Sequence, residues 1–283
     1  MNQELMTLDF WQDTVIYEGK TFPVGTLACD ALNVSADTLA KMNEQCQKIN
    51  LLLGMLNAGQ DASALCPMAR EATLAMLDTL SETPPFSYMD IPKHRERIER
   101  VFTAENALKY VEFAIKAATN SLQFEEIQNY AEAITLQRYT AVCGHLAYSL
   151  GEYQTAMLDF AEQSDRNEAD RTAEGFARMF GNYFPPEFSI TEGNAWMSIL
   201  NNSVQYVSAI RPSEDVAKLV KRMHYVSFVG MFRSDLFEGL CVGHAPKKCK
   251  ICGKWFLTTN ARHTKYCALC TGGQAAPHLP ADR

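Results

Sequence analysis

The chain has 283 residues, of which 47% are hydrophobic and 21% are charged, so it is long enough to bury at least one full core. This composition excludes a disordered protein. No uninterrupted apolar stretch approaches the ~18 residues of a membrane helix, and the first residues lack the basic segment and apolar run of a secretory signal. We therefore expect a cytoplasmic, globular protein with no membrane partner.

The net charge of −7 conceals an asymmetry along the chain. Residues 239–281 contain six lysines and arginines and no aspartate or glutamate. Because Asp282 and Arg283 cancel, the first 238 residues carry a net charge of −13. An acidic body with a basic end is typical of proteins whose terminal segment faces a polyanion.

The first region of the chain predicts a small β-hairpin. β-Branched and aromatic residues lie on both sides of Glu18-Gly19-Lys20, a sequence that suits a tight turn. We expect this hairpin at about residues 13–27.

Beyond the hairpin, apolar residues recur at steps of three and four, which predicts amphipathic helices. Ser35 and Thr103 precede two of these segments and are suitable helix caps. The expected helices are Ala36–Asn57, Ala69–Leu80, Ala104–Ala118, Phe124–Ala161 in two pieces that meet near Gly151, and a long helix from Pro212 to Gly239 or Gly243.

Four of the nine cysteines form two C-x-x-C pairs near the end of the chain, Cys249 with Cys252 and Cys267 with Cys270. Fourteen residues separate the pairs, about one fewer than is usual in four-cysteine zinc sites. Two residues between thiolates allow a tight turn to direct both sulfurs at one ion, and Gly253 permits the left-handed backbone of such a turn. Soft thiolates favour zinc or iron, and we expect one structural Zn²⁺ ion with no open position for catalysis.

The sequence alone leaves two other interpretations of these cysteines open. In one of them, His263 takes the place of Cys270 as a metal ligand. His263 lies four residues before Cys267, so the two side chains share a face if this segment is helical. A redox C-x-x-C is the other interpretation, but a thioredoxin-like βαβ pattern does not precede Cys249. The remaining cysteines are expected to be reduced, buried thiols: Cys29, Cys46, Cys66, Cys143 and Cys241.

Together these patterns predict a mainly α protein: a helical bundle with the small N-terminal β-hairpin and a C-terminal finger resembling a zinc ribbon or zinc knuckle. We expect the helical body to span residues 1–243 and the finger residues 244–273. Residues 274–283 are rich in Gly, Ala and Pro and are expected to form a disordered tail.

Basic and aromatic residues surround the cysteines of the finger. Cations attract phosphate groups, and an exposed aromatic ring can stack on bases, so the finger is a candidate surface for DNA or RNA. The residues expected to contact nucleic acid are Lys247, Lys248, Lys250, Lys254, Trp255, Arg262 and Lys265.

The segments "CKICGKWF" and "RHTKYCALC" resemble the finger of CGNR-type proteins, in which a mostly helical domain precedes a zinc finger. In this chain Thr-Gly-Gly follows Cys270 where that group has Gly-Asn-Arg. The layout is more similar to an uncharacterised bacterial family, mainly from Firmicutes, whose long helical body ends in "C-x-x-C-G-k-x-F … Y-C". The first resemblance implies a role in transcription regulation, whereas the second implies the architecture and the metal site but no activity.

The sequence supports two functional hypotheses. In the first, the finger binds nucleic acid, as in a transcription regulator, while the acidic body senses a ligand or forms a homodimer. In the second, the protein is a protein-interaction or mobile-element accessory module whose finger is purely structural. The chain has no Gly-rich phosphate loop, no His-Glu-x-x-His and no Gly-x-Ser-x-Gly, so we do not expect an enzyme.

Overall fold

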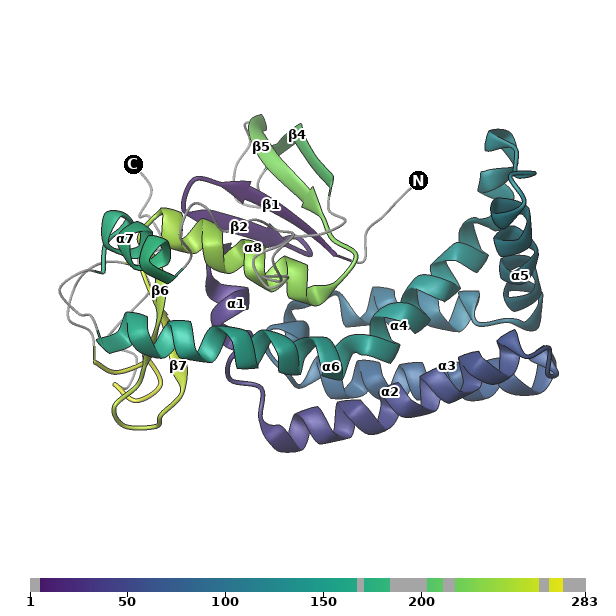
Figure 1. Cartoon of the computed structure of the whole chain (residues 1–283), viewed down its shortest axis with the longest axis horizontal. Coiled ribbons are helices and arrows are strands. Elements are labelled where there is room, and N and C mark those ends of the chain that lie inside the picture. Colours follow the sequence, from purple (N-terminus) through teal and green to yellow (C-terminus); the bar gives the residue numbers. More distant parts are fainter. Residues whose placement is uncertain (1–5, 167–170, 184–202, 211–216, 260–264, 272–283) are drawn as a thin grey trace. The chain divides into compact units, whose positions relative to one another are not determined.

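The computed structural model of the chain describes residues 6–166, 171–183, 203–210, 217–259 and 265–271 (Figure 1). Contacts divide the chain into two compact units. Unit one comprises Met1–Thr7, Val34–Gly151 and His224–Phe228, and unit two comprises Leu8–Asn33, Glu152–Met223 and Val229–Arg283. The domain boundaries expected at residues 243 and 273 stay a prediction.

Unit one is built from helices. They are α2 (Ala36–Asn57), α3 (Ala62–Ser81), the 3₁₀ turn η1 (Phe86–Tyr88), α4 (Ile91–Val101), α5 (Ala104–Ala118), the 3₁₀ segment η2 (Phe124–Tyr130) and α6 (Ala131–Arg166) up to Gly151. Eight α-helices occur among the described residues of the chain, which confirms the mainly α prediction. Within the same residues, no helix is both long and apolar enough to cross a bilayer.

Local capping explains why two helices begin where the sequence predicts. The Ser35 hydroxyl accepts a hydrogen bond from the Thr38 backbone N–H at 3.1 Å, and Thr103 caps α5 through the Asn106 N–H at 3.2 Å. The break predicted near Gly151 is wrong, because α6 continues through it. A single glycine costs a helix only about 1 kcal/mol, which the packing of neighbouring buried side chains offsets.

Two hydrogen bonds join other helices of unit one to α6. Cys46 of α2 donates its thiol hydrogen to the Cys143 carbonyl of α6 at 2.9 Å. From α4, the buried imidazole of His94 is hydrogen-bonded through Nδ1 to the Tyr139 hydroxyl of α6 at 2.8 Å. Both bonds lie among buried apolar side chains, so they fix α2 and α4 along the first half of α6.

Unit two combines a sheet with shorter helices. One sheet is formed by β1 (Thr7–Trp11), β2 (Thr14–Tyr17), β3 (Lys20–Pro23), β4 (Ser203–Ile210) and β5 (Ala217–His224), in the order β3-β2-β1-β5-β4. A second, two-stranded sheet consists of β6 (Ala245–Lys248) and β7 (Trp255–Thr258). The helices are α1 (Thr26–Ala31), the end of α6, α7 (Ala173–Tyr183) and α8 (Phe228–Cys241).

The predicted N-terminal hairpin is confirmed as β2 and β3. These strands are antiparallel, and Tyr17 pairs with Lys20 across a two-residue turn. Both turn residues have positive φ, 48° at Glu18 and 76° at Gly19. Positive φ at both positions defines the type I′ turn that matches the twist of paired strands.

The long helix predicted from Pro212 onward is wrong. Residues 217–224 form β5, and α8 begins only at Phe228. Arg222 of β5 donates two hydrogen bonds to the Asp9 carboxylate of β1, each 2.7 Å long, and the Lys218 ammonium lies 5.3 Å from the centre of the Trp11 ring. These cross-strand pairs with β1 favour the extended conformation over a helix.

Helix α8 supports the start of α1 through a buried carboxylate. Asp235 is fully buried and accepts hydrogen bonds from the Gly25 and Ala28 backbone N–H groups, at 2.8 and 2.9 Å. Gly25 has a φ of 96°, and a Cβ there would lie 3.0 Å from the Leu257 side chain of β7. Only glycine suits both this backbone conformation and this close contact. The start of α1 therefore meets both α8 and β7.

We predict that Asp235 makes the stability of the protein depend on pH. Burial raises its pKa from 3.8 to about 7, although the backbone N–H groups of Ala28, Gly25 and Leu27 oppose this shift. Between about pH 4 and pH 7 the native state keeps a proton that the unfolded chain releases, so the free energy of unfolding falls as pH rises through this window. The slope is at most about 1.4 kcal/mol per pH unit.

Chemical denaturation of the wild type and of Asp235→Asn from pH 5 to pH 8 tests this prediction. The wild type should lose stability relative to the variant as pH rises, because the amide does not titrate. Titration of the cysteines is common to both proteins and cancels in the difference. A stability difference that is constant, or that grows in favour of the wild type toward pH 8, would contradict the raised pKa.

Candidate metal centre

The first C-x-x-C pair lies in a turn that directly follows β6. The Gly253 N–H donates to the Cys249 carbonyl at 3.0 Å, and the Cys249 N–H donates to the Lys254 carbonyl at 2.9 Å. Gly253 has a φ of 70°, as the sequence predicts for the residue after the second cysteine. The antiparallel strands β6 and β7 close this turn through the pairing of Lys248 with Trp255.

The second pair forms a similar turn, in which the Cys270 N–H donates to the Cys267 carbonyl at 3.0 Å. One backbone bond joins the two turns directly, from the Lys250 N–H to the Lys265 carbonyl at 3.1 Å. The two pairs are thus held beside each other by the main chain as well as by the cysteine side chains.

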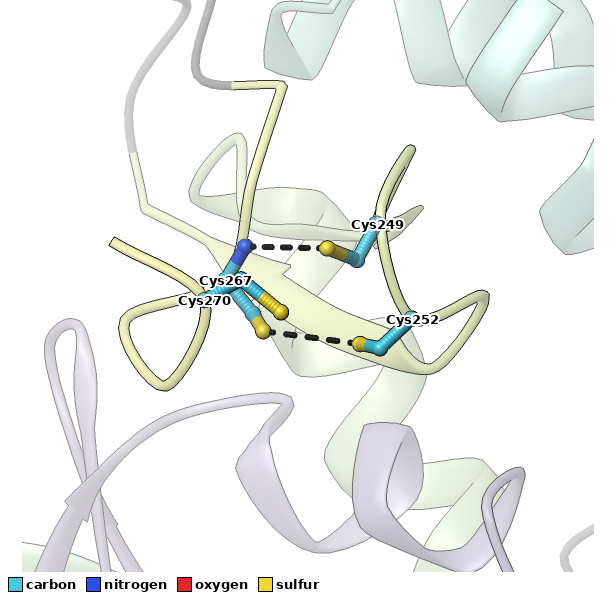
Figure 2. Close-up of side chains that lie close together, drawn as sticks. All are labelled: Cys249, Cys252, Cys267 and Cys270. Carbon is cyan, nitrogen blue, oxygen red and sulfur yellow. Dashed lines mark hydrogen bonds between the residues drawn. The ribbon is translucent and has the colours of Figure 1, made fainter. Parts of the chain in front are cut away.

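The four cysteines converge on one point (Figure 2). The sulfurs of Cys249, Cys252, Cys267 and Cys270 all lie within 4.8 Å of one another, and those of Cys252 and Cys267 are 3.7 Å apart. A tetrahedral zinc ion with bonds of ~2.3 Å separates its sulfurs by roughly 3.8 Å. The cluster therefore has the size and the donor set for one tetrahedral metal ion.

Electrostatics within the cluster also favour a cation. Backbone N–H groups of Cys252 and Cys267 lower the pKa of the Cys249 thiol to about 6, and the Cys267 N–H lies 3.4 Å from its sulfur. The neighbouring thiols raise the pKa of Cys270 to about 12. Four adjacent thiols therefore ionise together only if a positive charge lies among them, which a divalent ion supplies.

Asn33, which follows α1, holds the base of the finger. Its side chain accepts a hydrogen bond from the Trp255 backbone N–H at 2.7 Å and donates one to the Trp255 carbonyl at 2.8 Å. This pair of bonds extends the edge of β7 much as another strand would, and Trp255 itself is only 6% exposed.

Arg171, which precedes α7, is a second anchor of the same hairpin. Its guanidinium is buried and donates to the Ala245 and Pro246 carbonyls of β6, both at 3.1 Å. It also donates to the Thr258 hydroxyl of β7 at 2.8 Å and to the Ser164 carbonyl of α6 at 3.2 Å. One side chain thus joins both strands of the finger to α6.

The residues predicted to contact nucleic acid fall into different environments. Lys247 and Trp255 are buried, at 1% and 6% exposure, so neither side chain offers a contact surface. Lys248 is exposed but lies 3.7 Å from the Glu162 carboxylate and 5.5 Å from the centre of the Trp255 ring. The other predicted side chains within the described residues are exposed: Lys250, Lys254 and Lys265.

Two predicted site residues, Arg262 and the alternative ligand His263, lie outside the described residues. Of the other cysteines, Cys241 is exposed, which corrects the prediction of a buried thiol there, whereas Cys29, Cys46, Cys66 and Cys143 are buried as expected.

Sequence reasoning missed the anchors Asn33 and Arg171. Their types are ordinary in loops, and their partners lie far away in the sequence, so no local pattern identifies them.

Comparison with known proteins finds a family model that matches the region around the cysteine cluster. Residues 197–276 match a family of unknown function (DUF6076). The matched region contains β4, β5, α8 and all four cysteines of the cluster. Neither the curated proteins nor the solved structures gave a significant match to the chain. The similarity therefore covers the candidate metal centre and the elements before it, but supplies no activity.

Proposed function

We propose that the protein is a zinc-binding protein in which one Zn²⁺ ion, held by the four cysteines, fixes the finger onto unit two. The observation that carries this proposal is the convergence of the four sulfurs within 4.8 Å. A four-cysteine shell suits zinc and leaves no ligand position for water or substrate, so the proposed role is structural and not catalytic. The hydrogen bonds that Asn33 and Arg171 form with the finger support this role, because they join the finger to other parts of unit two.

A structural finger is consistent with a protein-interaction or accessory module. The third residue of each C-x-x-C turn is a large aliphatic side chain, Ile251 in one and Leu269 in the other, and these are 64% and 88% exposed. Exposed apolar side chains on turns fixed by a metal ion favour contact with another protein over contact with water.

Nucleic-acid binding is the second candidate function. Lys250, Lys254 and Lys265 are exposed around the cysteines, and no carboxylate occurs in residues 239–281 to neutralise them. The resemblance to the fingers of CGNR-type proteins supports a regulator-like role of this kind, and the resemblance to the Firmicutes family supports a bacterial origin. The burial of Lys247 and Trp255 reduces the contact surface, which is why we rank this function second.

Removal of zinc by a chelator, followed by two measurements, tests both candidates. If the ion is structural, we expect a lower melting temperature for unit two, because binding to the native state alone stabilises it. A finger that unfolds separately, without changing the melting temperature of the rest of unit two, would contradict the structural role.

If the finger binds nucleic acid, retention of the zinc-loaded protein on mixed DNA and RNA should fall steeply with salt and disappear after chelation. Absence of salt-sensitive retention would exclude the second candidate.

A further inference from the structure

Unit one contains a cleft far in the sequence from the four clustered cysteines of the candidate metal centre. The cleft lies between the end of α4, η2 and the start of α6, and its volume is about 940 Å³. Clefts of ~300–1,000 Å³ are typical of small-molecule sites in proteins. All of its lining residues belong to unit one, so the cleft is formed within a single compact unit.

Arginines line this cleft in an otherwise acidic chain. Arg97 and Arg100 come from α4 and Arg138 from α6. Arg100 is paired with Glu132, which also lines the cleft, at 3.2 Å. Glu125 is the other carboxylate of the lining, so the arginines exceed the carboxylates by one.

Arg138 is the most informative of these residues. Its side chain is partly buried, yet among the residues that the structure describes it has no ion-pair or hydrogen-bond partner. Partial removal of a guanidinium from water is unfavourable unless an anion or acceptor compensates it. Its planar group of N–H donors matches the oxygens of a carboxylate or a phosphate.

Aliphatic side chains supply the rest of the cleft wall. Val101 of α4, Ile127 of η2 and Ile134 of α6 all contribute to it. A free inorganic anion gains nothing from such a wall, whereas a molecule with an apolar body and an anionic group gains from both parts of the lining.

We propose that this cleft binds a small amphipathic organic anion, with its carboxylate or phosphate group at Arg138 and Arg97 and its apolar body against Ile127 and Ile134. This proposal does not depend on the metal centre. It gives unit one a ligand-binding role that is separate from the role of the finger.

Isothermal titration of the full-length, zinc-loaded protein tests the proposal with four compounds. Octanoate and octyl phosphate carry both required parts, octanol lacks the charge, and inorganic phosphate lacks the apolar body. We expect one or both of the first two to bind, and the better binder identifies the preferred anionic group. Octanol and inorganic phosphate should bind at least about tenfold more weakly, because each loses one set of contacts.

Substitutions then locate the binding site. Arg138→Gln should weaken binding of the preferred anion about tenfold or more, through loss of a charge-assisted hydrogen bond. Ile127→Glu, which places a carboxylate in the cleft, should abolish binding. Arg95→Gln is the matched control, because Arg95 also lies on α4 but pairs with Asp78 and does not line the cleft. Its affinity should equal that of the wild type.

The proposal is overturned if neither octanoate nor octyl phosphate binds the wild type at millimolar concentration, or if octanol binds as tightly as octanoate. It is also overturned if binding persists unchanged in both Arg138→Gln and Ile127→Glu. Melting temperatures of the variants distinguish lost binding from lost folding. If one variant fails to fold, the other decides the outcome.

Discussion

Replacing Cys267 by serine is expected to release the metal ion and to destabilise unit two by about 3 kcal/mol or more. The side chain of Cys267 is buried, its sulfur lies 3.7 Å from that of Cys252, and its N–H lies 3.4 Å from the Cys249 sulfur. A serine removes one of four ligands and leaves the remaining thiols crowded without a cation. Structural zinc contributes an apparent ~10–16 kcal/mol in isolated fingers, so loss of a fraction of this energy is a large effect.

Cys241→Ser is the matched control for this substitution. Its thiol is exposed and does not belong to the cluster, so the stability change should stay within about 0.5 kcal/mol. Zinc content and chemical denaturation of both variants give the comparison. Equal stability of the two variants, with zinc retained in Cys267→Ser, would show that Cys267 is not a ligand.

The second large effect is expected from Arg171→Leu, which should cost about 3 kcal/mol or more. The substitution removes a hydrogen-bond donor from the buried carbonyls of Ser164, Ala245 and Pro246, and of these Ala245 keeps the bond from the Thr258 hydroxyl at 3.0 Å. Each buried group left unsatisfied costs roughly 1–3 kcal/mol. Arg171→Lys should not restore stability, because an ammonium group does not reproduce the flat arrangement of donors that reaches both strands.

Hydrogen exchange at the backbone amides of β6 and β7 measures the loss of stability directly in the two strands that Arg171 joins to α6. Arg166→Leu is the control, since Arg166 is an exposed residue whose pairing with Glu162 at 3.6 Å is a surface contact. We expect fast exchange in Arg171→Leu and near wild-type exchange in Arg166→Leu. Similar exchange in the two variants would mean that Arg171 does not anchor the finger.

The elements that the sequence predicts correctly are those determined by neighbouring residues. Ser35 and Thr103 cap their own helices, and the turn at Glu18-Gly19 defines its own hairpin. The cysteine spacing likewise predicts which sulfurs converge, because two residues within each pair fix a local turn. Short-range geometry is sufficient in each of these cases.

The incorrect predictions concern features that depend on distant residues. The apolar residues from Leu219 to Leu236 recur at helical steps but are divided between β5, α8 and the link between them. The extended conformation of β5 depends on pairing with β1, more than 200 positions earlier. Trp255 likewise lies on β7, which contacts α1 and is hydrogen-bonded to Asn33 from far away in the sequence, so its exposure could not be judged from the finger sequence alone.

Metal analysis of the purified protein tests the central claim most directly. The account predicts one zinc ion per chain in the wild type and almost none in the double variant Cys249→Ser, Cys252→Ser. In the wild type, the number of thiols that react with a thiol reagent should be higher after chelation than before it. A wild-type protein without bound metal, or a double variant that keeps its zinc, would contradict the claim that these cysteines hold a structural ion.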